Sequence, residues 1–523
     1  MSEFLRLEGL RKYFASSGVL AVADVSLSVA AGEVVALVGE NGTGKTTLMN
    51  LLFGAFPMDE GRVFIDGEEV QIRGAEDAIS RGIGMVQQHF ALVPSFTVAQ
   101  NVMLGRERTR GGRVDDRAAE EYVRELGLRL GFPLDPTDVV ATLPIGLQQR
   151  VEILKALAGD TRLLILDEPT AVLTPAEAQE LIVAVRQLAR SGTAVVFISH
   201  KLPEVMAVAD RIVVMRRGHV VGEMPVGDAS PARIARLMVG REVLLRAEIA
   251  DREPGEPMLV VRDLVAHQVS AGDSGLAGVD LEVRGGEIVG IAGVSGNGQG
   301  NLIDAIAGLR KVDSGEVSIA GRIVTNRGPR VARSVGLAHI AEDRMHVGLN
   351  REATLAENAV SVAYRQSRFS RWGFLKGRSI YEFAREVIED YVVRGGAPRR
   401  VIGNLSGGNL QKIVIGRELD GDPAVIIANQ PTRGLDVGSI EFVHRALLDA
   451  RLRGAGVLLV SAELEEIMTL ADRIFVIYDG AVTGPYARGE LSNVEIGALM
   501  AGRSAHDVRG AEDARGVESA AIG

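Results

Sequence analysis

Short runs of apolar residues recur along the chain. They read VVALV, LLIL, AVVFI, IVGIAGV, AVIIA and VLLV. Each run is long enough for a buried strand. None approaches the length of about 20 mostly apolar residues that a membrane-spanning helix requires. Segments with helical patterns separate the runs, and strands that alternate with helices predict α/β domains with a largely parallel core sheet.

The pattern occurs twice. The segment LVGENGTGKTT has its first motif glycine at Gly39, and the similar IAGVSGNGQGN has its own at Gly293, an offset of 254 residues (293 − 39). Farther on, LILDEPT and IIANQPT place Asp167 opposite Asn429, an offset of 262 residues (429 − 167). The second copy therefore carries eight extra residues (262 − 254) between these motifs. Insertions of this kind usually lie in surface segments.

The repeat predicts two tandem domains, residues 1–240 and residues 258–502. The polar stretch REVLLRAEIADREPGEP, which contains prolines, is expected to join them as a linker over residues 241–257. Residues 503–523 have little apolar content, which predicts a mobile tail.

Composition and charge remove several kinds of chemistry. The chain has no cysteine, which excludes disulfides, thiolate zinc sites and cysteine nucleophiles. Its formal net charge of −10 disfavours a general nucleic-acid binder. The opening residues MSEFLRLEGLRKYF lack the long apolar core of a secretory signal, so none is expected there.

The first glycine motif has the form of a phosphate-binding loop. Residues 39–46 match G-x-x-x-x-G-K-[ST] directly after the run VVALV. Lys45 can reach the β- and γ-phosphates of a nucleotide, and the Thr46 hydroxyl can bind Mg²⁺. Lysine is scarce, with seven in the chain, which favours a specific role here over a plain glycine-rich turn. The predicted nucleotide-binding residues of this motif are Gly39, Asn41, Gly42, Gly44, Lys45, Thr46 and Thr47.

Polar side chains after later apolar runs fit the same site. In LLILDEP, Asp167 is suited to holding Mg²⁺ and Glu168 to polarising the attacking water, with a capping pair at a strand end as the rival interpretation. Gln88 can sense the metal or the γ-phosphate. His200, at the end of VVFISH, can contact that phosphate, although a lone histidine usually has no special role. Phe14 or the tyrosine before it can stack on adenine or simply pack.

These motifs, together with LSGGN at Leu405–Asn409, resemble those of the ABC ATPase family, and the resemblance extends over residues 5–502. LSGGN precedes a helical pattern. There, the Ser406 hydroxyl and the N–H groups of Gly407 and Gly408 would meet an anion at a helix N-terminus. A plain helix cap is the alternative for this serine.

More narrowly, the chain is similar to the fused ATP-binding subunits of bacterial importers for nucleosides and simple sugars. This likeness is carried by GMVQQHFALVP, VEILKAL, LLILDEPTAVLTP, AEDR, QPTRGLDVG and SAELEEI. The QQHF and ANQPT segments look more like the nucleoside branch than the ribose and galactose branch.

The resemblance implies two P-loop ABC domains, each a RecA-like core sheet with a helical subdomain and an antiparallel β subdomain. It implies ATP and Mg²⁺ as cofactors. The implied partners are two membrane permease subunits and an external substrate-binding lipoprotein, with the chain at the cytoplasmic face of the cell membrane. The segments that follow Gln88 and Glu342 would dock the permeases, with packing inside the domain as the alternative.

ABC domains pair head to tail, so the resemblance assigns each ATP to the phosphate loop of one half and the LSGGN-type signature of the other. Site one then combines Lys45, Thr46, Gln88, Asp167, Glu168 and His200 with Ser406, Gly407, Gly408 and Asp436. Site two has departures at the matching positions: Gln299, Gly300, Glu342, Asn429, Gln430, Ala462, Pro144, Ile145 and Thr174. We expect hydrolysis at site one alone. For site two, binding without turnover and no binding are both left open.

The leading functional hypothesis is an import ATPase for a nucleoside or a related simple sugar. An ATPase of a ribose or galactose importer is a near alternative. A soluble tandem ABC protein acting on ribosomes or DNA commonly has two intact sites and a long charged linker, and this chain has neither. The intact set of Lys45, Asp167, Glu168 and His200 argues against a non-catalytic scaffold.

Overall fold

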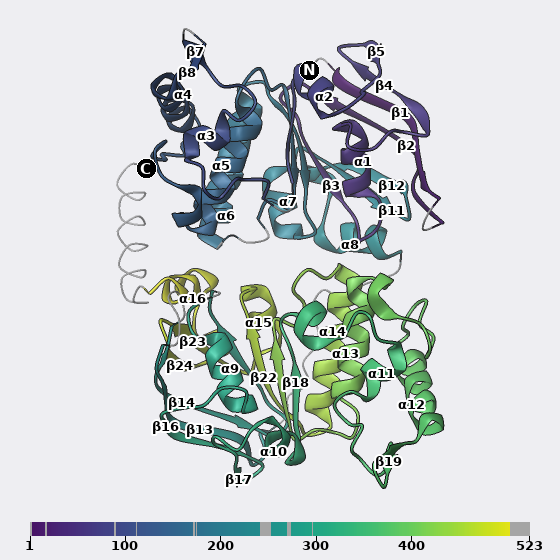
Figure 1. Ribbon diagram of the computed structural model, residues 1–523, viewed down its shortest axis with the longest axis vertical. Coiled ribbons are helices and arrows are strands. Elements are labelled where there is room, and N and C mark those ends of the chain that lie inside the picture. The colour runs from purple at the N-terminus through teal and green to yellow at the C-terminus, as the bar shows by residue number, and fades with distance from the viewer. Residues whose placement is uncertain are drawn as a thin grey trace. The chain divides into compact units, whose positions relative to one another are not determined.

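The computed structural model describes residues 3–15, 18–87, 90–110, 112–170, 173, 175–240, 253–268, 274–294 and 296–502. The chain divides into two compact units, one made mainly of Met1–Val243 and the other of most residues from Leu244 on (Figure 1). The expected tail 503–523 and most of the expected linker 241–257 lie outside the described residues. Each unit is described by itself below.

A six-stranded sheet in the order β12-β11-β3-β10-β9-β6 forms the centre of the first unit. Its neighbouring strands are parallel except for the antiparallel pair β11 and β12. The predicted runs VVALV, LLIL and AVVFI lie in β3, β9 and β10, and all residues of these strands are buried. Such runs are typical of parallel strands covered on both faces. The strands are β3 (Val34–Val38), β6 (Ile83–Val86), β9 (Leu163–Asp167), β10 (Ala194–Ile198), β11 (Arg211–Arg216) and β12 (His219–Pro225).

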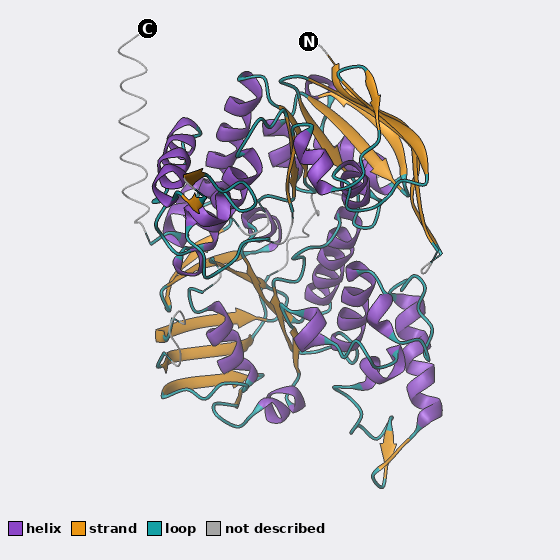
Figure 2. Cartoon of the chain, turned by 45° about the horizontal axis from the view of Figure 1, so that its top comes forward, coloured by secondary structure: helices purple, strands orange, loops and turns teal. Residues whose placement is uncertain are grey.

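An antiparallel sheet in the order β2-β1-β4-β5 and a set of helices complete the first unit (Figure 2). The strands of this sheet are β1 (Glu3–Phe14), β2 (Val19–Ala30), β4 (Glu60–Ile65) and β5 (Glu68–Val70). The helices are α1 (Lys45–Leu52), α2 (Ala75–Ser80), α3 (Val98–Val102), α4 (Asp116–Arg129), α5 (Ile145–Leu157), α6 (Pro175–Arg190), α7 (Leu202–Val208) and α8 (Pro231–Val239). A small hairpin, β7 (Thr109–Arg110) and β8 (Arg113–Val114), lies between α3 and α4 in the chain.

The second unit repeats this topology. Its core sheet has the order β18-β21-β22-β15-β23-β24, and its antiparallel sheet has the order β14-β13-β16-β17. The core strands are β15 (Ile288–Ala292), β18 (Leu337–Ile340), β21 (Val425–Asn429), β22 (Gly456–Ser461), β23 (Arg473–Tyr478) and β24 (Ala481–Ala487). The antiparallel strands are β13 (Pro257–Ala266), β14 (Leu276–Arg284), β16 (Ser314–Ile319) and β17 (Arg322–Ile323).

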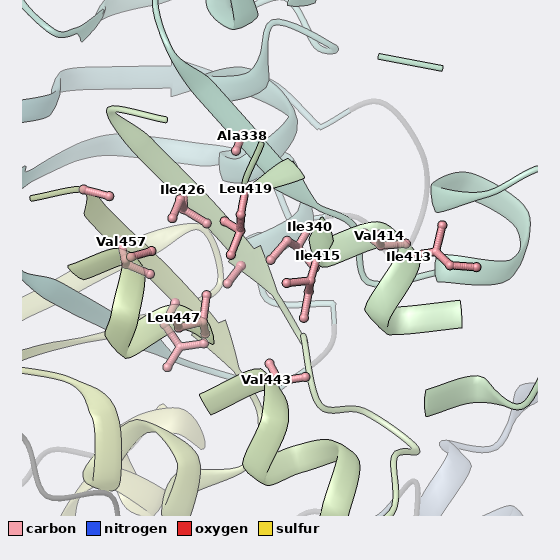
Figure 3. Packing of buried hydrophobic residues seen from close by; sticks show 14 of the residues in the cluster. Ala338, Ile340, Ile413, Val414, Ile415, Leu419, Ile426, Val443, Leu447 and Val457 are labelled. Carbon is pink, nitrogen blue, oxygen red and sulfur yellow. The ribbon is translucent and has the colours of Figure 1, made fainter. Parts of the chain in front are cut away.

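The helices of the second unit correspond to those of the first. They are α9 (Gln299–Ala307), α10 (Pro329–Ser334), α11 (Leu355–Val360), α12 (Gly377–Asp390), α13 (Gly407–Glu418), α14 (Val437–Leu452), α15 (Leu464–Leu470) and α16 (Asn493–Met500). A hairpin of β19 (Ser370–Arg371) and β20 (Phe374–Leu375) lies between α11 and α12 in the chain. Figure 3 shows part of the core, where Ile340, Ile415, Leu419 and Ile426 pack together.

The eight extra residues of the second copy lie in its helical subdomain. The N-cap threonines Thr97 and Thr354, each in a capping box, differ by 257 (354 − 97), three more than the offset of the glycine motifs. The hairpin residues Arg110 and Arg371 differ by 261 (371 − 110), which places four more residues between Thr354 and β19. The last extra residue follows α12, because the short helical turns at Val140–Thr142 and Ile402–Asn404 differ by 262 (402 − 140). The first three fall around a π-helical turn at Arg344–Gly348, which has no buried residue.

The predicted fold class is confirmed: each unit has a RecA-like core sheet, an antiparallel β subdomain and a helical subdomain. Each of the six apolar runs noted in the sequence forms most or all of a core-sheet strand. In the part of the chain that the structure describes, every helix is too short or too polar to span a membrane.

Candidate nucleotide site

The glycine loop between β3 and α1 has the geometry of a phosphate cradle. β3 ends at Val38 and α1 begins at Lys45. Gly44, just before the helix, has a φ of 100°, a left-handed conformation that strains other residues. A Cβ atom on Gly39 would lie 2.3 Å from the Met215 carbonyl oxygen, so only glycine fits there. A loop of this form presents backbone N–H groups at a helix N-terminus, where anions bind.

Lys45 is buried at the start of α1 although its side chain carries a charge. Its Nζ donates hydrogen bonds to the carbonyl oxygens of Gly39 at 2.7 Å and Glu40 at 3.0 Å. Burial lowers the pKa of Lys45, whereas the carboxylates of Glu168 and Asp167 act in the opposite direction. The ammonium group is therefore held inside the cradle, where phosphate oxygens can replace the carbonyl oxygens.

Thr46 and Asp167 form a pair of oxygen donors beside the cradle. Asp167 is the last residue of β9, and the Thr46 hydroxyl donates a hydrogen bond to its carboxylate. Burial raises the pKa of Asp167, the Thr46 hydrogen bond opposes the rise, and repulsion from Glu168 adds to it. Hydroxyl and carboxylate oxygens are ligands that Mg²⁺ takes, with water and phosphate oxygens filling its other positions. This donor set fits the predicted metal position.

Glu168 and His200 are in direct contact. His200 Nδ1 lies 3.1 Å from Glu168 Oε1. Burial opposes ionisation of Glu168, but the hydrogen bond from His200 and the positive charges nearby outweigh it, so the pKa of Glu168 is lowered. Glu168 has a φ of 49°, and its N–H donates to the Ile198 carbonyl oxygen at 2.9 Å. A carboxylate held ionised in this way is suited to act as a general base.

A cavity of about 470 Å³ lies over the cradle. Its lining comprises Phe14, Val19, Ala21, Asn41, Gly42, Gly44, Lys45, Thr46, Thr47 and Glu168. Phe14 is the last residue of β1, and its ring lies edge-on to Phe56, with ring centroids 5.5 Å apart. The two roles considered for Phe14 are therefore compatible, because the same ring packs on a neighbour and lines the cavity.

Two residues singled out in the sequence, Gln88 and Thr174, lie outside the described residues, and the roles given to them stay predictions.

The signature segment LSGGN begins helix α13 in the second unit. Ser406 is exposed just before the helix, and its side chain makes no capping hydrogen bond. Ser406 Oγ instead accepts a hydrogen bond from Asn409 Nδ2 at 2.8 Å. Ser406 thus occupies the N-cap position without the side-chain hydrogen bond that a plain helix cap would make. Gly408 is buried, and a Cβ atom on Gly407 would lie 2.8 Å from Nη2 of Arg344.

Asp436, the remaining residue predicted for site one, directly precedes α14.

The second unit has the same cradle with neutral side chains. Gln299 is the first residue of α9 and is buried, and its Nε2 donates to the Val294 carbonyl oxygen at 2.6 Å. Asn429 ends β21, where Asp167 ends β9 in the first unit. Gln430 has a φ of 47°, and its Oε1 accepts a hydrogen bond from the Ala462 N–H at 3.2 Å.

The other departures assigned to site two are also visible. Glu342 forms an ion pair with Arg433. Gly300 follows Gln299 and offers no hydroxyl that could bind a metal ion. In the first unit, Pro144 precedes helix α5, and Ile145 is half-exposed at its start. Pro144 has neither a hydroxyl nor an N–H to offer a phosphate.

One pair of matching side-chain contacts was not predicted from the sequence. Lys155 Nζ, near the end of α5, donates to the Ala91 carbonyl oxygen at 2.6 Å. Arg417 Nη1, at the matching place in α13, donates to the Gly348 carbonyl oxygen at 2.9 Å. Both bonds tie a signature helix to the segment that follows Gln88 or Glu342. Two features of the sequence could have pointed to this pair: lysine is scarce in the chain, and Lys155 and Arg417 differ by the offset of 262 (417 − 155) that relates the two signature segments.

The family model described as ABC transporter matches residues 22–171 and 276–433. The nucleoside import ATP-binding protein NupA of Lactococcus lactis is 44% identical, over 91% of this chain and 94% of the relative. The glucose import ATP-binding protein TsgD13 of Haloferax volcanii is 42% identical, over 95% of this chain and 96% of the relative. The guanosine import ATP-binding protein NupO of Bacillus subtilis is 43% identical, over 96% of this chain and 98% of the relative.

A solved structure described as RNase-L Inhibitor has a TM-score of 0.64 to this chain, with 19% identity over 94% of this chain and 92% of that one. At this identity the likeness concerns the fold alone. The family match covers parts of both units. The similar import proteins have nearly the same length as this chain. The first unit also has the phosphate cradle with a lysine, a carboxylate pair and a histidine. The chain belongs to the ABC transporter family.

Proposed function

We propose that the chain is the ATP-hydrolysing subunit of an importer and that it turns over ATP at site one only. The observation that carries the proposal is the contact of 3.1 Å between His200 Nδ1 and Glu168 Oε1 beside the phosphate cradle of Lys45. The second unit has Gln430 and Ala462 in the corresponding places, which can neither take a proton from water nor donate from a ring nitrogen.

In this proposal different residues of the first unit bind the nucleotide, hold the metal ion and transfer the proton. The loop N–H groups and Lys45 bind the phosphates, and Phe14 stacks on adenine. Thr46, Asp167 and Gln88 hold Mg²⁺, which neutralises charge on the transferring phosphoryl group when bound. Glu168 accepts a proton from the attacking water, and His200 holds the Glu168 carboxylate ionised and in position.

Site one is completed in the proposal by the second half of the chain. Ser406, Gly407 and Gly408 contribute a hydroxyl and N–H groups to the γ-phosphate, and Asp436 contributes a carboxylate to the same site. The exposure of Ser406 and the absence of a capping bond in the described structure support this role, because its hydroxyl is not committed to its own helix. ATP then draws the halves together, and hydrolysis lets them part.

Site two is proposed to be without turnover. Gln299, Asn429 and Gln430 supply no charge to a phosphate or a metal ion. Losing a general base costs about 10²–10⁴ in rate, and each lost charge-assisted contact costs ~1.5–3 kcal/mol. The glycine backbone supports retention of nucleotide without turnover.

The proposed cargo is a nucleoside or a related simple sugar. Relatives whose names refer to nucleoside and guanosine import support the first, and a glucose import relative at 42% identity supports the second. The proposed partners are two membrane permease subunits and an external substrate-binding lipoprotein, which would place the chain at the cytoplasmic face of the membrane. A cavity of about 780 Å³, lined by residues 345–353 and parts of α11 and α13, supports a docking role for the segment after Glu342.

Uptake in cells tests the proposal. Radiolabelled guanosine, adenosine, glucose and ribose are offered to cells that lack the gene, and to the same cells complemented with the natural chain or with Glu168→Gln. We expect uptake of one class of cargo to depend on the natural chain and to be lost with Glu168→Gln. Uptake of every compound independent of the chain, together with co-sedimentation with ribosomes, would contradict the import function.

A further inference from the structure

The hairpin of β19 and β20 exposes large apolar side chains at its tip. Trp372, the single tryptophan of the chain, is 86% exposed, Phe374 is 79% exposed and Leu375 is 59% exposed. Figures 1 and 2 both show this hairpin extending away from the helices of its own unit. Apolar groups gathered at a projecting tip mark an interaction surface, because they contribute nothing to the core.

The turn itself does not explain the choice of residues. Trp372 and Gly373 both have positive φ values, 55° and 84°, and such two-residue turns favour Asn-Gly or Gly-Gly. In the matching hairpin of the first unit, the sequence has Gly111 at the place of Trp372 and Arg113 at the place of Phe374. The aromatic tip is therefore a property of the second unit alone and is held against the local backbone preference.

The base of the hairpin fixes the tip in place. Phe369, just before β19, is fully buried, and its ring centroid lies 5.2 Å from that of Phe383 on α12. The N–H of Lys376 donates to the Phe369 carbonyl oxygen at 2.8 Å. The exposed side chains thus stand on an ordered support anchored in the helical core.

The hairpin is also strongly basic. Residues 364–378 include five arginines and lysines and no acidic residue, in a chain with a formal net charge of −10. Arg368 and Arg378 form ion pairs with glutamates of α12. Across the described ranges, Arg365, Arg371 and Lys376 have no ion-pair partner. The tip therefore combines apolar surface with uncompensated positive charge.

We infer that this hairpin binds an anionic lipid surface. Trp372, Phe374 and Leu375 enter the region between head groups and acyl chains, where tryptophan is enriched, and the basic residues contact lipid phosphates. Weak apolar insertion and a basic patch are the two signals that together give stable membrane attachment. Three side chains offer on the order of 500 Å², too little for a stable protein–protein interface, which takes about 800 Å² from each partner.

The single tryptophan makes the test specific. The full-length chain is mixed with vesicles of phosphatidylcholine alone or with added phosphatidylglycerol, and Trp372 emission and flotation are measured. We expect a blue shift and co-flotation with the anionic vesicles only, both weakened by salt. No permease and no ATP hydrolysis are needed, so failure here leaves the proposed transport function untouched, and ATPase activity is measured in parallel.

Two variants separate the contributions. Trp372→Gly with Phe374→Arg gives the hairpin the residues of its first-unit counterpart, and we expect flotation with anionic vesicles to fall about tenfold or more. Arg371→Glu with Lys376→Glu should lower it as well. The matched control is Arg110→Glu in the hairpin of the first unit, which should leave flotation within about twofold of the natural chain.

Three results would overturn the inference. One is the absence of any blue shift or flotation with anionic vesicles. A second is equal binding to neutral vesicles, which removes the role of charge. The third is a blue-shifted emission without lipid together with the mass of a dimer, which makes a second copy of the chain the partner of the hairpin.

Discussion

The two phosphate cradles of the molecule share a backbone and differ in their side chains. Gly44 and Gly298, which precede the two cradle helices, both have a φ of 100°. Glu168 and Gln430 occupy the same left-handed position at 49° and 47°. Their core sheets have the same strand order. The first cradle nevertheless holds an ammonium group, two carboxylates and an imidazole, and the second holds amides and a methyl group.

Comparing the two cradles distinguishes the contacts that maintain the fold from the charged groups that hydrolysis requires. Gln299 is buried like Lys45, and like Lys45 it donates to a carbonyl oxygen of its own loop. Gln299 therefore packs as Lys45 does and makes one such hydrogen bond, but it carries no positive charge. Gln430 likewise keeps a hydrogen bond to the residue opposite, since Ala462 donates with its N–H where His200 uses its ring. The second unit is thus a control for the first within one chain.

The largest expected effect comes from the residue that accepts the proton. Glu168→Gln gives the first unit the side chain of the second, and ATP turnover should fall by about 10²–10⁴ because the general base is lost. Gln430→Ala should leave most of the turnover. Steady-state phosphate release from the purified chain measures both, and equal losses would contradict the asymmetry.

The cradle lysine gives the next largest effect. Lys45→Gln should lower nucleotide binding or turnover about 10- to 100-fold, since a charge-assisted contact to phosphate is lost. Gln299→Lys should produce no new turnover, because Asn429 and Gln430 remain neutral. Binding of a fluorescent ATP analogue, measured beside the rate, shows which step is affected. A gain of turnover in Gln299→Lys would mean that site two needs only a cation.

The signature serine tests whether Ser406 serves phosphate or its own helix. Ser406→Ala should lower ATP turnover about tenfold, because one hydrogen bond to phosphate is lost. Thermal stability should hardly change, since Ser406 makes no capping bond to α13. Pro144→Ser, at the matching position of the first unit, should change neither quantity by much. A clear fall in melting temperature for Ser406→Ala, with unchanged kcat, would restore a structural role.

The smallest expected effect is a shift in pH dependence. In the natural chain the pKa of Glu168 is lowered, so the base stays ionised below the pH at which an ordinary glutamate takes up a proton. His200→Ala removes the hydrogen bond and charge of His200 that lower this pKa, so that burial, which raises it, is opposed only by Lys45 and Lys201. The acidic limb of kcat/KM against pH should therefore move to higher pH. Ala462→His in the second unit should not move this limb.

The sequence predicted the elements that repeat and the residues that carry charge. The apolar runs marked core strands. The roles of Lys45, Thr46, Asp167, Glu168 and His200 stay predictions from motif and position, and the structure brings these side chains together around one cavity. Contacts that depend on several distant elements were not predictable. The Glu168–His200 contact joins two strand ends 32 residues apart, and no local pattern specifies which atom of His200 meets the carboxylate. His200 was expected to contact phosphate, and the structure adds its bond to Glu168.

Some local expectations were also incomplete. Serine at a helix start usually caps the helix, yet Ser406 bonds to Asn409 instead, because a side-chain amide three residues on competes with the backbone. The positions of the eight extra residues were expected only as a surface insertion. Their division among a π-helical turn, the segment before β19 and the segment after α12 follows from packing that a sequence comparison does not contain. The boundaries 1–240 and 258–502 stay a proposal.

The hydrogen bond from Arg417 to the Gly348 carbonyl oxygen connects the end of helix α13 to the segment that follows Glu342. Arg417 lies near the last turn of this helix and Ser406 just before the first, about 16 Å apart at the rise of an α-helix. The guanidinium is buried and also bonds to Ser361 at 3.0 Å, so it cannot swing freely. If the segment at Gly348 were displaced, helix α13 would have to move with it, and its start at Ser406 would change position as well.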